Sequence, residues 1–347
     1  MSQLYDSKWN KTALEIADMC DVSLLDMKTK LPEYKNDRDV SNDVFLKSLA
    51  QAGLRKRRNN KVTDADQKRL NYELDVLIEL GFTNYFLIVY DVIRFAKQRG
   101  INVGPGRGSA AGSLIAYALG ITEVDPMVFD LLFERFLNPE RLSMPDIDID
   151  FPDDKRDEVV RYVQNKYGFD HVAHIIAFGT LRGRQSFRDS GRILNIPLHK
   201  VDQAVKMISP KGLNDTFLKN KRFKLLIDRD KQLQACYELA LKLENTPRHI
   251  TQHAAGIVLS DKPLLSVVPL YRIDEDTHVI QYDMTHIEKL GLIKIDFLGI
   301  RNLSLIDRIS NNVKKALPTF NIQKIPYDDH KTYDLISNGH TTGVFQL

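Results

Sequence analysis

The run MPDIDIDF, residues 144–151, constrains the fold of this chain more than any other segment. Acidic and apolar residues alternate in it: Asp146, Asp148 and Asp150 with Ile147, Ile149 and Phe151. Alternation of period two predicts a β-strand that buries the apolar side chains on one face and directs the three carboxylates to the other. Successive carboxylates on that face are ~6.6 Å apart along the strand. Their side chains can therefore converge on one ion.

The negative charge of a row of carboxylates must be compensated. Two unit negative charges ~4 Å apart repel by roughly 4 kcal/mol at an effective dielectric of about 20. Hard cations with oxygen ligands, Mg²⁺ above all, are the natural partners. Two other interpretations stay open: a calcium loop of the EF-hand type, in which Phe151 stands where a Gly is required, and an edge strand whose acids prevent aggregation.

A second alternating run, GLIKIDF at residues 291–297, predicts another strand with Lys294 and Asp296 on its polar face. If the two strands are neighbours, three carboxylates and a lysine share one site. That composition suits two-metal phosphoryl or nucleotidyl transfer, in which two ions lie ~3.5 to 4 Å apart and the lysine binds phosphate. Taken alone, Lys294 and Asp296 are equally explained as a surface ion pair.

The glycine-rich segment GPGRGSAAGS, residues 104–113, leads into an apolar segment, 114–119, that is helical by composition. Glycines allow a ligand close to the backbone, and free amides at a helix start attract anions, with Arg107 as a forked donor. We therefore expect a phosphate-binding loop, with a tight structural turn as the alternative. The spacing matches neither the P-loop nor the dinucleotide-binding fingerprint.

The net charge of +3 hides two opposed blocks. Residues 121–160 hold twelve acidic against four basic side chains, and residues 178–231 hold thirteen basic against five acidic ones. We interpret these blocks as a cation-binding centre beside a helical surface that binds a polyanion, although two solvated faces would give the same counts.

The remaining segments set the organisation. With 347 residues and 43% apolar content, the chain is long enough for two or three domains. Residues 1–60 are expected to form a polar lead-in with little core and a basic patch at 55–58. Helices are predicted over 63–80 and 85–98, followed by a short strand at 101–103. The sequence contains no secretion signal and no apolar span for a bilayer, so we expect a cytoplasmic protein without a membrane partner.

Five motifs in order, GPGRGSAAGS, LFERFLNPER, MPDIDIDF, HAAGIV and KIDFLG, resemble the alpha subunit of bacterial DNA polymerase III, the C-family replicative polymerase. The resemblance extends from about residue 12 to the end. Nothing resembles the exonuclease insertion of the other large Gram-positive class, which favours the DnaE class.

The resemblance implies an α+β fold: a palm like that of polymerase beta nucleotidyltransferases, with a mixed sheet and helices, interrupted by a helical thumb. The expected divisions are the tail of an upstream phosphoesterase-like domain at 1–15, palm at 16–177 and 252–301, thumb at 178–251, and the start of the fingers at 302–347.

It also implies the site residues. Asp146, Asp148 and Asp296 match the metal-binding aspartates, which leaves Asp150 as a neighbour. The nucleotide-contacting positions of the family fall on Arg107, Gly108, Ser109, Arg135 and Lys294. Arg135 is equally explained as an ordinary surface arginine. His253, in HAAG, matches a family motif but is expected to be structural.

The implied activity is Mg²⁺-dependent DNA polymerisation with two ions, primer-template DNA and dNTP. In the full-length subunit the sliding clamp and the clamp loader are further partners. The basic helical block is expected to contact DNA through Arg182, Arg184 and Arg188. Two rivals remain: a two-metal nuclease, and a DNA-binding fragment that is inactive without complete fingers.

Overall fold

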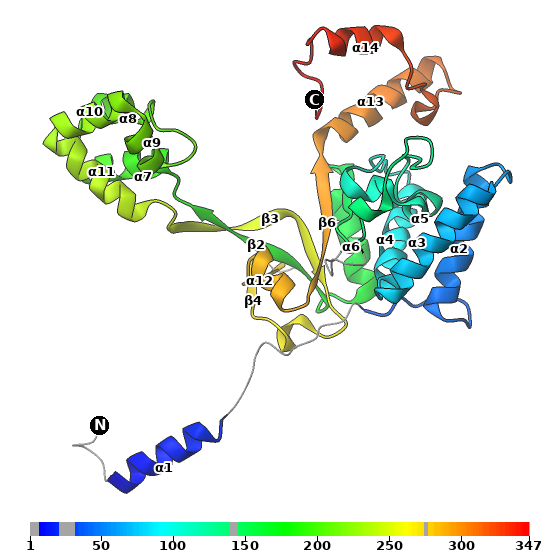
Figure 1. Cartoon of the computed structure of the whole chain (residues 1–347), viewed down its shortest axis with the longest axis horizontal. Coiled ribbons are helices and arrows are strands. Elements are labelled where there is room, and N and C mark those ends of the chain that lie inside the picture. Colours follow the sequence, from blue (N-terminus) through cyan, green and yellow to red (C-terminus); the bar gives the residue numbers. More distant parts are fainter. Residues whose placement is uncertain (1–6, 21–31, 139–144, 274–276, 347) are drawn as a thin grey trace.

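The alternating runs fold into adjacent strands of one sheet. The computed structural model describes residues 7–20, 32–138, 145–273 and 277–346. Within them six strands lie in the order β1-β6-β3-β2-β5-β4. Their bounds are β1 Asp148–Pro152, β2 Val172–Thr180, β3 Pro247–Leu259, β4 Leu270–Arg272, β5 His278–Ile280 and β6 Ile293–Ile300 (Figure 1). β1 with β6 and β2 with β5 are parallel, and the other pairs are antiparallel. The predicted mixed α+β class is confirmed.

Each face of the sheet has its own cover. Ile149, Phe151, Ile295 and Phe297 point into the main core, which the sheet shares with a group of five helices (Figure 1). These helices are α2 Asn42–Arg57, α3 Asp64–Glu79, α4 Thr83–Gln98, α5 Leu114–Ala118 and α6 Arg156–Tyr167. The opposite face packs against a smaller cluster from η3 Leu264–Ser266 and α12 Met284–Lys289. Side chains that alternate with the core residues of β1 and β6 therefore lie on the α12 side.

The prediction for residues 1–60 is wrong. Besides α1, Ser7–Asp18, whose described side chains are exposed, the segment contains α2, which buries Leu46, Ala50 and Leu54 in the main core. These three residues recur every four positions, so they form an apolar stripe between polar neighbours. The predicted basic patch is partly internal as well, because Arg57 and Arg58 form ion pairs with acids of the 121–160 block.

The predicted helices at 63–80 and 85–98 are confirmed as α3 and α4. Thr63 caps α3 in a capping box with Asp66. The strand predicted at 101–103 is wrong, because this segment pairs with no strand. The next residue, Gly104, contacts the sheet: its amide donates a backbone hydrogen bond to the Asp150 carbonyl oxygen at 2.9 Å. Gly104 allows that approach, since a Cβ there would lie 2.8 Å from the Asp150 Cβ.

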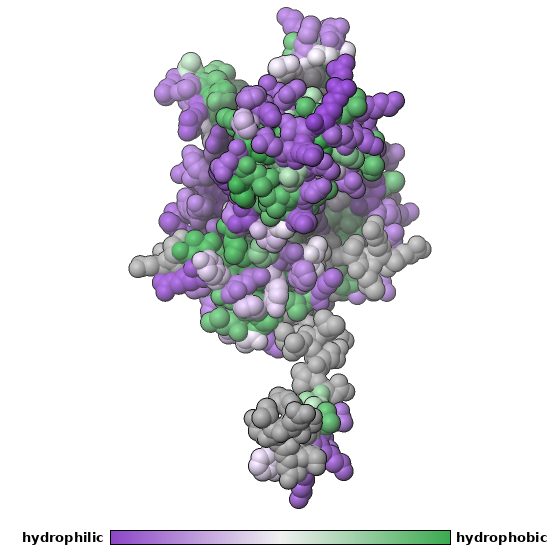
Figure 2. Space-filling view, turned by 90° about the vertical axis from the view of Figure 1, so that its left-hand side faces the viewer, coloured by the Kyte–Doolittle hydropathy of each residue, from purple (hydrophilic) through white to green (hydrophobic). Residues whose placement is uncertain are grey.

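A separate helical lobe is inserted between β2 and β3. It consists of α7 Gly183–Ile193, α8 Leu198–Val205, α9 Leu213–Lys219, α10 Lys221–Arg229 and α11 Lys231–Leu243. The lobe has its own core, in which Phe187, Phe223 and Cys236 are fully buried. A ribbon of β2 and β3 joins it to the rest of the molecule (Figure 1). The side of the molecule that carries the lobe is largely hydrophilic, with hydrophobic patches between the polar groups (Figure 2).

The C-terminal helices follow the sheet directly. α13, Arg301–Ala316, continues from β6 and packs against β1. η4, Ile322–Lys324, and α14, His330–Ser337, come next, and α14 buries no residue. Among the described helices none is by itself long and apolar enough to cross a membrane. Among these helices, only the pair of α3 and α4 has the combined length and apolar composition of a membrane span, and the two helices are bent by 114° at their junction.

Candidate metal centre

The two alternating strands bring three carboxylates together. β1 and β6 are neighbours in parallel register, with Asp148 directly opposite Asp296. Carboxylate oxygens of Asp146, Asp148 and Asp296 all lie within 4.8 Å of one another. The two strands are thus adjacent, which is the condition for a site shared by the polar faces of both strands.

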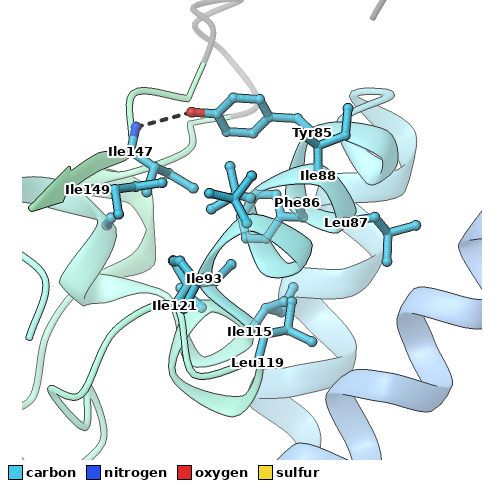
Figure 3. Close-up of a cluster of buried hydrophobic side chains, with 14 of the residues drawn as sticks. Tyr85, Phe86, Leu87, Ile88, Ile93, Ile115, Leu119, Ile121, Ile147 and Ile149 are labelled. Atoms are coloured by element: carbon cyan, nitrogen blue, oxygen red, sulfur yellow. Dashed lines mark hydrogen bonds between the residues drawn. The ribbon is translucent and has the colours of Figure 1, made fainter. Parts of the chain in front are cut away.

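Asp146 differs from its prediction in one respect, because β1 begins only at Asp148 and Asp146 precedes the strand. The backbone between them is fixed by Tyr85, whose hydroxyl oxygen accepts a hydrogen bond from the Ile147 amide at 3.2 Å (Figure 3). Tyr85 is buried against Ile147 in the main core. Burial, together with the nearby aspartates, raises the pKa of Tyr85 well above its ordinary value, so the hydroxyl stays neutral.

The cluster spans a gradient from solvent to interior. The side chains of Asp146, Asp148 and Asp296 are 64%, 32% and 9% exposed. Among the described residues, no group donates a hydrogen bond to the buried Oδ1 of Asp296. A buried carboxylate oxygen without a donor is costly unless a cation compensates it. The donor set is oxygen only, so the cluster fits a hard divalent cation.

Lys294 belongs to the same cluster. Its Nζ lies 2.7 Å from Asp296 Oδ2 and 3.9 Å from Asp146 Oδ1, and its side chain is only 13% exposed. The ion pair between Lys294 and Asp296 therefore exists, but it is not a surface pair. The edge-strand interpretation is also partly right: β1 is at the end of the described sheet, yet its Asp148 converges with Asp146 and Asp296.

Arg107 approaches the cluster from the glycine-rich segment. Its guanidinium lies 3.7 Å from Asp148 Oδ1 and 3.4 Å from Asp150 Oδ1. Burial, opposed by Arg107 and reinforced by Asp148, raises the pKa of Asp150. Asp150 is absent from the group of three converging carboxylates. It lies beside Arg107 instead, as the prediction of a neighbour rather than a ligand requires.

The glycine-rich segment exposes the two residues that were predicted to contact nucleotide. Gly108 and Ser109 are exposed at the start of η1, Gly108–Gly112. Gly108 has φ +65°, a conformation that side chains other than glycine rarely adopt. Glycine at this position leaves the backbone without a side chain next to Arg107, which lies beside the carboxylates.

One part of the phosphate-loop prediction is wrong. We expected free amides at the start of the following helix, but the amides of Leu114 and Ile115 donate to the carboxylate of Glu73, at 3.0 and 3.1 Å. Ser113 caps the next amide, that of Ala116. Because an internal carboxylate already accepts from these amides, the amides of Leu114 and Ile115 are not available to an anion.

Arg135 is at the end of η2, Phe133–Arg135, and is exposed. Within the described part of the chain no ion pair links it to the carboxylates. η2 nevertheless packs against η1, since a Cβ on Gly112 would lie 2.6 Å from the Leu132 carbonyl oxygen. The segment of Arg135 and the glycine-rich segment are therefore in direct contact.

His253 stabilises a wide bulge beside the cluster. In the pairing of β2 with β3, His174 is opposite Ile257 and Ile176 is opposite Gln252, so four residues of β3 face a single one of β2. Those four are the HAAG motif. The His253 Nδ1 accepts hydrogen bonds from the amides of Gly256, at 2.9 Å, and Ala255, at 3.3 Å. Gly256 is paired with Asp296, so the structural imidazole supports the strand beside the carboxylates.

The three arginines predicted to bind DNA are in the helical lobe, separate from the carboxylates. Arg182 is exposed at the N-cap of α7. Arg184 Nε donates to the Ile208 carbonyl oxygen at 2.9 Å, and Arg188 lies 3.5 Å from Asp202. All three are exposed, although two of them are partly engaged within the lobe.

Sequence reasoning missed Glu73 and Arg69, which hold the glycine-rich segment. A signal was present: Glu73 falls within the apolar stripe of Leu70, Leu74 and Leu77 on α3. A charged residue inside such a stripe indicates a buried polar contact. Four residues separate Arg69 from Glu73, which further indicates an ion pair.

The fold and the site define an α+β protein with a carboxylate cluster suited to divalent cations and flanked by basic side chains. Comparison with known sequences extends this description. The profile of the bacterial DNA polymerase III alpha NTPase domain matches residues 44–299, and that of the bacterial DNA polymerase III alpha subunit finger domain matches residues 302–347. The chain belongs to the bacterial DNA polymerase III alpha subunit family.

Individual relatives agree. DNA polymerase III subunit alpha of Bacillus subtilis is 47% identical over 341 residues, 97% of this chain and 30% of the relative. The proteins of the same name from Halalkalibacterium halodurans and Staphylococcus aureus are 44% and 45% identical over 96% of the chain. They are covered over 30% and 31% of their own length. The chain thus spans about a third of the length of these relatives.

Proposed function

We propose that this chain is the catalytic core of a DNA-directed DNA polymerase, which transfers a nucleotidyl group from a dNTP to the 3′-hydroxyl of a primer. The convergence of Asp146, Asp148 and Asp296 beside two basic side chains carries the proposal. The names of the relatives support the same role in bacterial DNA replication.

The three aspartates would hold two Mg²⁺ ions. When bound, these ions lower the pKa of the attacking hydroxyl and neutralise charge on the triphosphate. Lys294 and Arg107 would bind phosphate oxygens, since both are basic side chains that already lie among the carboxylates. Gly108 and Ser109 would offer backbone and hydroxyl groups to the triphosphate, and Arg135 would approach it from the adjoining segment.

In this assignment the sheet with α2 to α6 is the palm, and the helical lobe is the thumb that binds primer-template DNA. α13 and α14 would begin the fingers, and α1 would end an upstream phosphoesterase-like domain. The division at 1–15, 16–177, 178–251, 252–301 and 302–347 is part of the proposal. The separate core of the lobe and its position between two strands of the sheet support it.

The partners of the full-length subunit would be the sliding clamp and the clamp loader, and the site of action would be the cytoplasm. Neither of these two partners has a role in the proposed chemistry of the carboxylate centre.

Primer extension tests the function. A labelled primer-template, Mg²⁺ and dNTPs are incubated with this chain and with a full-length alpha subunit that contains it, each as the natural sequence and as Asp148→Ala. We expect the natural full-length subunit to extend the primer and the variant to lose extension. Extension that survives Asp148→Ala would refute the assignment. Shortening of the primer would favour a nuclease, and DNA binding without extension by this chain alone would identify an inactive DNA-binding module.

A further inference from the structure

Glu73 is a fully buried carboxylate whose partners, apart from Arg69, lie where the glycine-rich segment joins α5. Its Oε1 accepts from the Leu114 amide at 3.0 Å, and its Oε2 accepts from the Ser113 hydroxyl at 3.0 Å and the Ile115 amide at 3.1 Å. One side chain of α3 therefore fixes residues 113–115, where the glycine-rich segment joins α5.

Arg69 completes the arrangement from one turn earlier on α3. Its Nε donates to Glu73 Oε1 at 2.6 Å. Its second guanidinium nitrogen donates to the carbonyl oxygens of Gly112 and Leu131, both at 3.0 Å. Gly112 ends η1, whereas Leu131 precedes the segment of Arg135. The guanidinium thus joins the two segments on which the proposed nucleotide contacts lie.

This pair costs more than a stabilising contact would justify. Burial raises the pKa of Glu73, although the amide and Arg69 hydrogen bonds oppose the shift. Apolar residues at such positions often give equal or higher stability, and in some proteins a buried ionic group is retained because it specifies one arrangement of its partners. Here the specified arrangement is that of the loop beside Asp148.

We propose that Arg69 and Glu73 are positioning residues for the incoming nucleotide. They hold Gly108 and Ser109, together with the segment of Arg135, in the geometry that receives the triphosphate. The inference rests on the proposed polymerase function and extends it to two residues that touch neither the metal ligands nor the substrate.

Hydrogen exchange of this chain tests the positioning without any activity. Glu73→Gln keeps the size of the side chain but replaces one acceptor oxygen by a donor that faces amide N–H groups. We expect amide exchange over residues 108–118 to become at least about tenfold faster. Asp91→Asn is the matched control, because Asp91 is also fully buried and paired with a basic residue, but its partners are on α4 and α6. The control should leave exchange over 108–118 unchanged.

Steady-state primer extension by the full-length subunit supplies the second measurement. Glu73→Gln should raise the KM for dNTP by about tenfold or more, as loss of a supporting residue commonly does, while the Kd for DNA stays unchanged. Ser113→Ala removes one donor to Glu73 and also the cap on the Ala116 amide, so its exchange is compared at residues 108–112, where we expect a smaller change in the same direction. It also provides the test if Glu73→Gln does not fold.

Unchanged exchange over 108–118 in these variants would overturn the positioning role. Faster exchange with an unchanged KM for dNTP would overturn its connection to the nucleotide. Failure of the polymerase assignment itself would be registered separately, by extension that survives Asp148→Ala.

Discussion

Asp148 lies directly opposite Asp296 in the parallel pairing of β1 with β6. Because side chains alternate between the two faces of a strand, a slip of one residue would place Ile149 on the polar face and Asp148 in the core. The main core therefore fixes the position of the carboxylates, since Ile149, Phe151, Ile295 and Phe297 are almost completely buried on the other side.

Asp148→Asn should weaken divalent-cation binding by more than about tenfold, because it removes one charged oxygen ligand. Asp150→Asn is the matched control on the same strand and should change the affinity little, since Asp150 faces Arg107 rather than the cluster. Calorimetric titration with Mn²⁺ measures the cation affinity of this chain and of both variants. Equal losses in the two variants would contradict the assignment of the ligands.

Gly256→Ala should destabilise the fold by about 1–3 kcal/mol, because overpacking a filled site forces its neighbours apart. The added Cβ would lie 2.7 Å from Ile175 Cδ1, 3.2 Å from His253 Nδ1 and 3.4 Å from Asp296 Oδ1. Gly299→Ala on β6 meets nothing closer than 3.4 Å and provides the control. Urea unfolding compares the two free energies of unfolding. If Gly256→Ala unfolds at the same urea concentration as the natural chain, the bulge is not closely packed.

Arg58→Met should cost about 3 kcal/mol of unfolding free energy, because it leaves two partly buried carboxylates without their cation. Arg58 pairs with Asp66 and with Asp125, whose side chains are 5% and 12% exposed. Arg55→Met removes the same charge from an exposed position of α2 and should cost little. Thermal and urea unfolding measure the stability lost in each variant. Equal losses in the two variants would argue against a buried ion-pair network of Arg58, Asp66 and Asp125.

Stability should fall as the pH falls below about 5. Burial disfavours ionisation of Asp66, but hydrogen bonds from Arg58 and Thr63 outweigh it and lower the pKa of Asp66 below its ordinary 3.8. The unfolded chain then binds the proton more readily, so the stabilisation is present above the unfolded pKa and is lost as the pH falls through the folded pKa. Urea midpoints between pH 7 and pH 3 should fall less steeply for Asp66→Asn. Parallel curves would contradict this contribution.

Replacing Arg182, Arg184 and Arg188 together by Ala should weaken duplex DNA binding and flatten its dependence on salt. The logarithmic slope should fall by about 0.9 for each phosphate contact that is lost. Binding isotherms at several salt concentrations measure the slope. The control removes three exposed arginines elsewhere: Arg55, Arg99 and Arg161. A slope that is unchanged in the lobe variant, or equally reduced in the control, would exclude these lobe residues from the DNA path.

Local periodicity predicted the elements that depend on one face of one segment. β1, β6 and α3 have regular apolar spacing, and their positions follow from it, whereas α4 contains a continuous apolar run at 85–90. The predicted shared site required β1 and β6 to be neighbours, and their parallel pairing confirms this condition. α2 was missed although Leu46, Ala50 and Leu54 recur at a helical spacing, because polar residues dominate the composition of residues 1–60.

Contacts between distant segments were not predictable in the same way. The amides of Leu114 and Ile115 at the start of α5 looked available for an anion, since Ser113 caps only the Ala116 amide. Their acceptor, Glu73, is on another helix, and only tertiary packing brings it there. Likewise, the basic residues at 55–58 looked like a surface patch, because Glu123 and Asp125, which pair with Arg57 and Arg58, are more than sixty positions away along the chain.

The insertion of the helical lobe between β2 and β3 has a consequence for biosynthesis. Asp148 emerges from the ribosome long before Asp296, and the whole lobe is translated between them. Until β6 is released, the nascent chain carries an incomplete carboxylate centre, and closing so long a connection is slow relative to local helix formation. Polypeptides that terminate early, before residue 293, would therefore possess a folded lobe and two of the aspartates, but would have no means of completing the cation site.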